Sequence, residues 1–187
     1  MGYIISSALK GETYRFFIDE AVKRSEYIEF DVLHVSEKAC SGDNDYFNAL
    51  KSKRKAKEYE SYYLNFLKGY NNVLLPFVNN LGYKLSKTDK PFNTIERVFM
   101  KINKEMINTL YEPECIMNWI APCYPENLKL IKDEHIWFFY ITYENHARIY
   151  YDSNEDFDYW KTNGIKNQAA FCYNEGDRWR DKHHSFI

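Results

Sequence analysis

The chain has 187 residues, of which 45% are hydrophobic, 18% aromatic and 28% charged, and its formal net charge is -2 at pH 7. A chain of this length can bury about 70% of its unfolded surface in one core, and its aromatic content excludes an intrinsically disordered protein. It has no run of about 18 apolar residues that could cross a membrane. Its first residues lack the basic and apolar regions of a secretory signal. We therefore expect a cytoplasmic protein without membrane association.

Residue spacing argues against the common cofactor and metal sites. The four cysteines have no CxxC spacing, and structural zinc sites usually need ligands two to four residues apart. The sequence also lacks a glycine-rich phosphate loop, a G-x-S-x-G motif and an H-E-x-x-H motif. We therefore expect reduced thiols, no metal and no cofactor.

The first part of the chain, residues 1–43, is predicted to be rich in strands. Residues 3–9 and 27–35 indicate strands, and in the second of these apolar and acidic side chains alternate. Residues 12–25 fit a helix and, in part, a strand. We favour the helix, whose apolar face would consist of Tyr14, Phe17, Ile18, Ala21 and Val22.

The middle of the chain, residues 44–110, is predicted to be helical. Apolar residues at helical spacing indicate helices over 45–68 and 71–81, with Gly82 placed to end the second one. A third helix is expected over 93–110. It would begin with a capping box, Asn93-Thr94-Ile95-Glu96, in which Asn replaces the usual Ser or Thr.

The last part, residues 111–187, is again predicted to be rich in strands. A short helix is expected at 125–133. The strongest β signal follows, because residues 136–143 and 147–151 are mostly aromatic or β-branched. Residues 144–146 between them indicate a hairpin turn.

These elements predict a single α+β domain over residues 1–187. Strands near both termini would form one antiparallel or mixed sheet, and a central group of about three helices would cover it.

Charge is distributed unevenly along the chain. Residues 1–43 carry a net charge of -3, residues 44–110 a net charge of +6 and residues 111–187 a net charge of -5. The basic excess is densest in residues 51–57, which either bind nucleic acid or form a solvated helix face. Charges in this run point all round a helix, and the isoelectric point is near 6.2. Nucleic-acid binding is therefore the less favoured interpretation.

A histidine between carboxylates is the best acid–base candidate. Glu144, His146 and Asp152 flank the predicted hairpin, and carboxylates can hold a histidine in one tautomer for general-base work. The tail adds His183 and His184. A small hydrolase or transferase is thus one alternative. Because polar residues gather at turns in any case, we favour a protein without a catalytic site.

The C-terminal part combines an aromatic surplus with its acidic charge. Tyr and Trp dominate binding hot spots, and acidic groups speed the encounter with a basic partner. The leading hypothesis is a module that neutralises or regulates a basic protein partner, as immunity and inhibitor proteins do. The competing interpretation is a core sheet with tyrosine hydroxyls at its rim. The predicted binding residues are Trp137, Tyr143, Tyr151, Asp156, Asp158 and Trp160.

Overall fold

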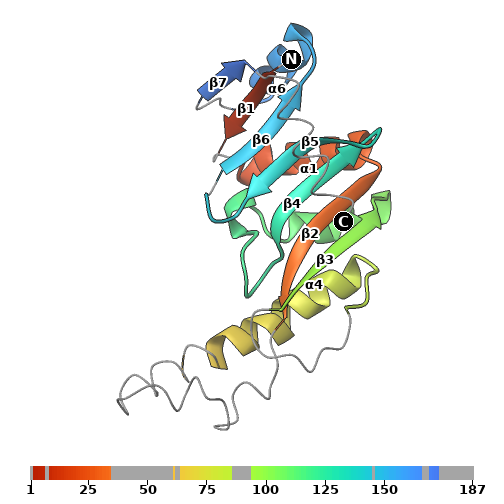
Figure 1. Ribbon diagram of the computed structural model, residues 1–187, viewed down its shortest axis with the longest axis vertical. Coiled ribbons are helices and arrows are strands. Elements are labelled where there is room, and N and C mark those ends of the chain that lie inside the picture. The colour runs from red at the N-terminus through yellow and green to blue at the C-terminus, as the bar shows by residue number, and fades with distance from the viewer. Residues whose placement is uncertain are drawn as a thin grey trace.

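Seven antiparallel strands form one sheet in the computed structural model, which describes residues 2–6, 9–34, 61, 64–85, 94–144, 146–165 and 169–172. Their order across the sheet is β3-β2-β4-β5-β6-β1-β7 (Figure 1). Their bounds are Gly2–Ser6 (β1), Tyr27–His34 (β2), Thr94–Lys101 (β3), Glu126–Lys132 (β4), His135–Ile141 (β5), His146–Tyr151 (β6) and Ala169–Cys172 (β7).

The N-terminal helix and strand agree with the sequence prediction. α1 spans Gly11–Arg24, so the ambiguous segment is helical, with Phe17 and Ile18 on its buried face. Glu12 in its first turn and Arg24 in its last complement the helix dipole. In β2, the predicted alternation places buried apolar residues on the side that faces the helices.

The expected helix over 93–110 is wrong. Its first part is β3, which pairs with β2 along its whole length, from Tyr27 opposite Lys101 to His34 opposite Thr94. Only a short 3-10 turn, η3 (Lys104–Met106), and the short helix α5 (Ile107–Tyr111) follow. The sequence had indicated strands only near the two ends of the chain. The structure shows that strands are not confined to those ends.

The expected short helix at 125–133 is also wrong, because this segment is β4. β4 lies between β2 and β5, and five of its seven residues are buried. Its apolar residues do not distinguish the two elements, because Leu128 and Ile131 have helical spacing while Leu128 and Leu130 alternate as in a strand. The predicted hairpin is confirmed, since β5 and β6 pair antiparallel from Phe138 opposite Ile149 to Ile141 opposite His146.

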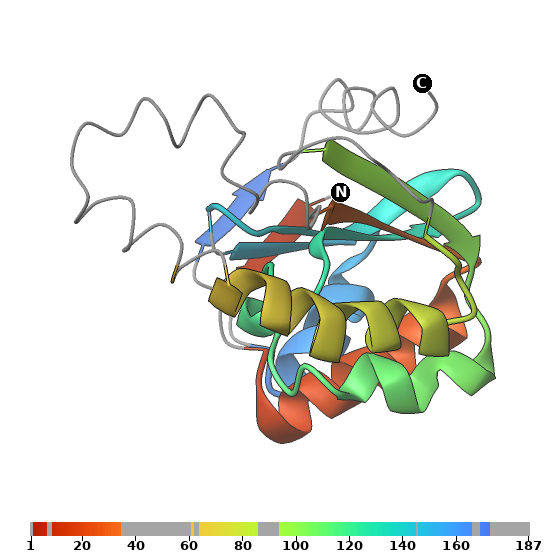
Figure 2. The same ribbon diagram turned by 90° about the horizontal axis from the view of Figure 1, so that it is seen from below.

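Helices cover one face of the sheet (Figure 2). Besides α1 and α5, these are α4 (Leu75–Asn80), which continues from the π-helical turn η2 (Tyr70–Leu74), and α6 (Asn154–Thr162). Gly82 ends the α4 segment with a φ of +87°, as its expected capping role requires. The core lies between this helix layer and the sheet and contains the fully buried Phe17, Phe77, Trp119 and Trp160.

Several predictions fall on other parts of the chain. The basic run 51–57, most of the helix expected over 45–68 and the C-terminal histidines lie outside the described residues. Of the four cysteines, Cys115 and Cys123 have side chains in the described part of the structure, and both are free thiols. No helix in the described part of the chain is both long and apolar enough to cross a membrane.

Candidate functional site

The six predicted binding residues do not form one continuous surface. Tyr143, in the turn after β5, is 82% exposed, whereas Trp160 on α6 is fully buried. The prediction that Trp160 belongs to a binding surface is therefore corrected: its ring stacks on Trp137 at 5.8 Å and forms part of the core. Tyr151 is half-buried against Phe157.

Two of the predicted binding residues, Trp137 and Asp156, and the acid–base candidate Asp152 line one hollow of about 510 Å³, which we call the acidic hollow. It lies where the end of α1, the β4–β5 turn, the end of β6 and the start of α6 meet. Its complete lining is Arg24, Lys132, Asp133, His135, Trp137, Tyr150, Asp152 and Asp156. Asp158 lies two residues beyond Asp156 on α6 and is exposed.

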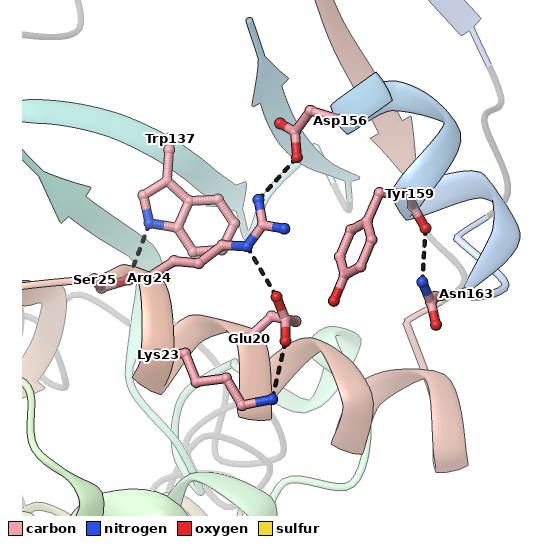
Figure 3. Close-up of polar contacts among 8 residues, drawn as sticks. All are labelled: Glu20, Lys23, Arg24, Ser25, Trp137, Asp156, Tyr159 and Asn163. Atoms are coloured by element: carbon pink, nitrogen blue, oxygen red, sulfur yellow. Dashed lines mark hydrogen bonds and ion pairs between the residues drawn. The ribbon is translucent and has the colours of Figure 1, made fainter. Parts of the chain in front are cut away.

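Arg24 is held tightly at the edge of this hollow (Figure 3). Its Nε donates to Oε2 of Glu20 at 2.9 Å, and its Nη1 donates to Oδ1 of Asp156 at 2.8 Å. The guanidinium also lies over the rings of Trp160 and Tyr159, at 4.6 and 4.9 Å from their centroids. Arg24 therefore joins α1 to α6 by two charged hydrogen bonds and two cation–π contacts.

The charge of Arg24 is balanced by this arrangement. Burial opposes the ionisation of Glu20, but hydrogen bonds from Lys23, Arg24 and Tyr159 outweigh it and lower the pKa of the Glu20 carboxyl. Glu20 is thus a carboxylate near neutral pH. Burial, and then the hydrogen bond to Glu20, raises the pKa of Tyr159, so its hydroxyl stays protonated.

The segments that form the hollow are acidic as a group. Residues 20–24, 132–135 and 152–158 carry seven Asp or Glu and three Lys or Arg. Trp137 supplies an aromatic wall, fixed in place by the hydrogen bond from its Nε1 to Oγ of Ser25 at 2.9 Å. An excess of carboxylates beside a fixed indole is suited to cationic groups.

A second hollow, of about 370 Å³, lies on the opposite side of β2 to the helix-facing Ile28, Phe30 and Val32, and we call it the sheet-face hollow. Its lining is Asp31, Arg97, Asn127, Lys129, Ile136, Phe139, Ile141 and Tyr143. Among the predicted residues, only Tyr143 belongs to it. The alternation in β2 had placed Glu29 and Asp31 on one face, but their partners on β3 and β4 were predicted to be helical.

Ion pairs across three strands join polar residues that line the sheet-face hollow to the buried Glu29, which is not part of the lining. Lys129 Nζ donates to Oε1 of Glu29 at 2.7 Å, and both side chains are largely buried, with exposures of 9% and 2%. Arg97 Nε lies 3.5 Å from the same Oε1 and 3.4 Å from Oδ1 of Asp31. Asn127 Nδ2 donates to Oδ2 of Asp31 at 3.0 Å.

A third polar cluster lies on the helix side of the sheet and was not predicted from the sequence. His34 Nε2 is 2.5 Å from Oε2 of Glu96, and the Tyr70 hydroxyl is 3.3 Å from His34 Nδ1. The Tyr83 hydroxyl donates to Oε1 of Glu96 at 3.1 Å. Burial and the Glu96 carboxylate raise the pKa of both tyrosines. The prediction of a helix over 93–110 hid this cluster, because it separated Glu96 from β2.

The predicted acid–base group does not come together. Glu144 is exposed in the turn before β6, whereas Asp152 follows the other end of this strand. The six residue-to-residue steps from position 146 to Asp152 span roughly 20 Å in an extended strand, far beyond hydrogen-bond reach. The side chain of His146 is outside the described part of the structure.

Comparison with known proteins does not assign the chain to a family. Among the described residues, no group of three or more His, Cys, Asp or Glu is arranged to hold a metal ion. No protein-family model matches the sequence, and neither the curated proteins nor the solved structures yielded a significant match. The geometry of the two hollows is therefore the basis for assigning a function to this α+β domain.

Proposed function

We propose that the chain is a cytoplasmic protein-binding module that recognises a basic partner, in the manner of an immunity or inhibitor protein, through the acidic hollow. One observation carries the proposal. Trp137 and Asp156, which the sequence had singled out for such a role, line a single hollow together with Asp133 and Asp152.

The chemistry of the hollow supports a lysine or arginine side chain as its occupant. A cation gains from carboxylates and from an aromatic face, and the gain increases when the contact is shielded from water. The chain's own Arg24 is held in this way at the edge of the hollow, between two carboxylates and over two aromatic rings. A partner's cation would meet the same kind of surroundings beside Asp133, Asp152 and Trp137.

The charge distribution supports an encounter steered by electrostatics. The excess of carboxylates around the hollow would attract a basic surface at long range, and such steering weakens as salt increases. Association with the partner should therefore become slower as the ionic strength increases, with a smaller effect on dissociation.

The proposal is tested by affinity capture and chemical cross-linking with the full chain from its organism of origin. The test variant is Asp133→Asn/Asp152→Asn, which removes two exposed charges from the hollow. The matched control is Glu105→Gln/Glu112→Gln, which removes two exposed charges from the segment around α5.

The expected result is a stoichiometric basic partner that is cross-linked at the β4–β5 turn or α6. The test variant should lose this partner, and the control should keep it. Equal capture by both variants, or the absence of any stoichiometric partner, would contradict the proposal.

A further inference from the structure

The sheet-face hollow differs from the acidic hollow in its charge balance. Its polar lining has two cations, Arg97 and Lys129, and one carboxylate, Asp31; the buried Glu29 lies outside the lining and pairs with Lys129, so the cluster as a whole is neutral. We propose that this hollow binds a free α-amino acid with an apolar or aromatic side chain, as the zwitterion. A ligand that carries both charges and is neutral overall matches a site with the same property.

The carboxylate side of the hollow can accept additional hydrogen bonds. Asp31 is the carboxylate of the lining, and its side chain is 14% exposed. The Arg97–Asp31 contact is long, at 3.4 Å. An ammonium group brings three donors to such acceptors.

The cationic side can receive a carboxylate. Arg97 is 45% exposed and reaches the hollow from β3, next to the edge of the sheet. A guanidinium presents its N–H groups as a planar fork that matches the two oxygens of a carboxylate. The cation of Arg97 and the anion of Asp31 therefore lie side by side, as do the two charges on an α-carbon.

The other wall of the hollow is apolar. Ile136, Phe139 and Ile141 come from β5, and Tyr143 extends this wall at the turn. Small-molecule sites occupy roughly 300–1,000 Å³, so a hollow of this size is at the lower end of that range. It suits one amino acid, whose side chain would pack on Phe139 while its α-carbon faces Asp31 and Arg97.

Calorimetric titration of the full chain tests this inference. L-phenylalanine and L-leucine are the ligands, and N-acetyl-L-phenylalanine and L-phenylalaninamide each lack one of the two charges. We expect saturable binding of the free amino acids, and affinities lower by about tenfold or more for both blocked forms, because each loses a charged hydrogen bond.

The blocked forms also distinguish a free amino acid from the end of a protein chain, which carries only one of the charges. If either blocked form binds as tightly as L-phenylalanine, the inference is wrong. It is equally wrong if no free amino acid binds up to about 10 mM, since a ligand of this size should reach roughly millimolar affinity.

Variants locate the site. Asp31→Asn and Arg97→Gln should each lower the affinity by about tenfold or more. Lys101→Gln is the matched control, because this residue is exposed on the same strand as Arg97 and outside the hollow; it should bind as the wild type does. Circular dichroism and thermal unfolding establish that the variants are folded. Unchanged binding in folded Asp31→Asn and Arg97→Gln variants would overturn the assignment, whatever the fate of the basic-partner proposal.

Discussion

The two hollows contain the same kinds of group but differ in how tightly these are held. At the acidic hollow, Arg24 makes contacts of 2.9 and 2.8 Å and lies over two aromatic rings. At the sheet-face hollow, the contacts of Arg97 are 3.4 and 3.5 Å. One arginine therefore fixes two helices together, whereas the other makes longer contacts and is 45% exposed. Contact geometry, more than residue type, separates a structural clamp from a binding group.

The largest difference between the two hollows is expected at Trp160, which is buried behind the acidic hollow. Trp160→Ala removes a fully buried ring that packs on Trp137 and carries Arg24. It should lower the free energy of unfolding by about 3–5 kcal/mol, as large-to-small substitutions of buried aromatic residues do. Urea unfolding measures the loss.

The control for this prediction is Tyr143→Ala at the sheet-face hollow, where the side chain is 82% exposed. Its effect should be less than about 0.5 kcal/mol. Similar losses of stability in the two variants would contradict either the burial of Trp160 or the exposure of Tyr143.

At the sheet-face hollow, the Glu29–Lys129 ion pair is shorter than the contacts of Arg97. Lys129→Met leaves Glu29 buried without its closest cation, and this should cost about 3 kcal/mol. The double variant Glu29→Leu/Lys129→Met should recover most of that loss, because no uncompensated charge remains. Chemical denaturation measures the stability of both variants. If the double variant is as unstable as Lys129→Met, this explanation is wrong.

The clamp itself should contribute less, since Arg24 is 31% exposed. Arg24→Ala should lower the free energy of unfolding by about 1–2 kcal/mol, through the loss of its hydrogen bonds to Glu20 and Asp156. Lys23→Ala is the matched control: its ion pair with the same Glu20 is much more exposed, so its effect on the free energy of unfolding should be clearly smaller than that of Arg24→Ala. Equal effects of the two variants in thermal unfolding would refute a special role for Arg24.

The smallest effect is a dependence on acid pH. The pKa of Glu20 is lower in the folded chain than its ordinary value, so the unfolded chain binds this proton more readily. The stability that Glu20 contributes is present above its ordinary pKa and is lost as the pH falls through the folded value. Urea midpoints from about pH 6 to about pH 3 should fall less steeply in Glu20→Gln than in the wild type. If the urea midpoints of the two proteins have the same pH dependence, the contacts of Glu20 with Arg24 and Lys23 do not lower its pKa.

Local patterns were sufficient where one side of an element faces the core. Alternation predicted β2, aromatic and β-branched composition predicted β5 and β6, and helical spacing resolved α1 correctly. The same reasoning failed at β3, where Ile95, Val98, Phe99 and Ile102 have helical spacing. Pairing with β2 from Tyr27 to His34 selects the strand, and this long-range contact leaves no mark in the local pattern.

The candidate site was found only in part for a related reason. Trp137, Asp152 and Asp156 lie within twenty residues of one another and share an acidic, aromatic segment, so composition pointed to them. Their partner Arg24 is 132 residues from Asp156 along the chain. Because the helix α6 was not predicted, nothing indicated that Trp160 would turn inward while Asp156 stayed at the rim.

The sequence by itself determined the α+β class, the hairpin of β5 and β6, and the acidic, aromatic character of the last third of the chain. These properties follow from composition and from periodicity over a few residues. Only the tertiary structure decided which aromatic residues are buried and where the two hollows lie, because each hollow joins side chains from segments far apart in the chain. The packing of strands and helices, and not their individual patterns, brings Arg24 to Asp156 and Arg97 to Asp31.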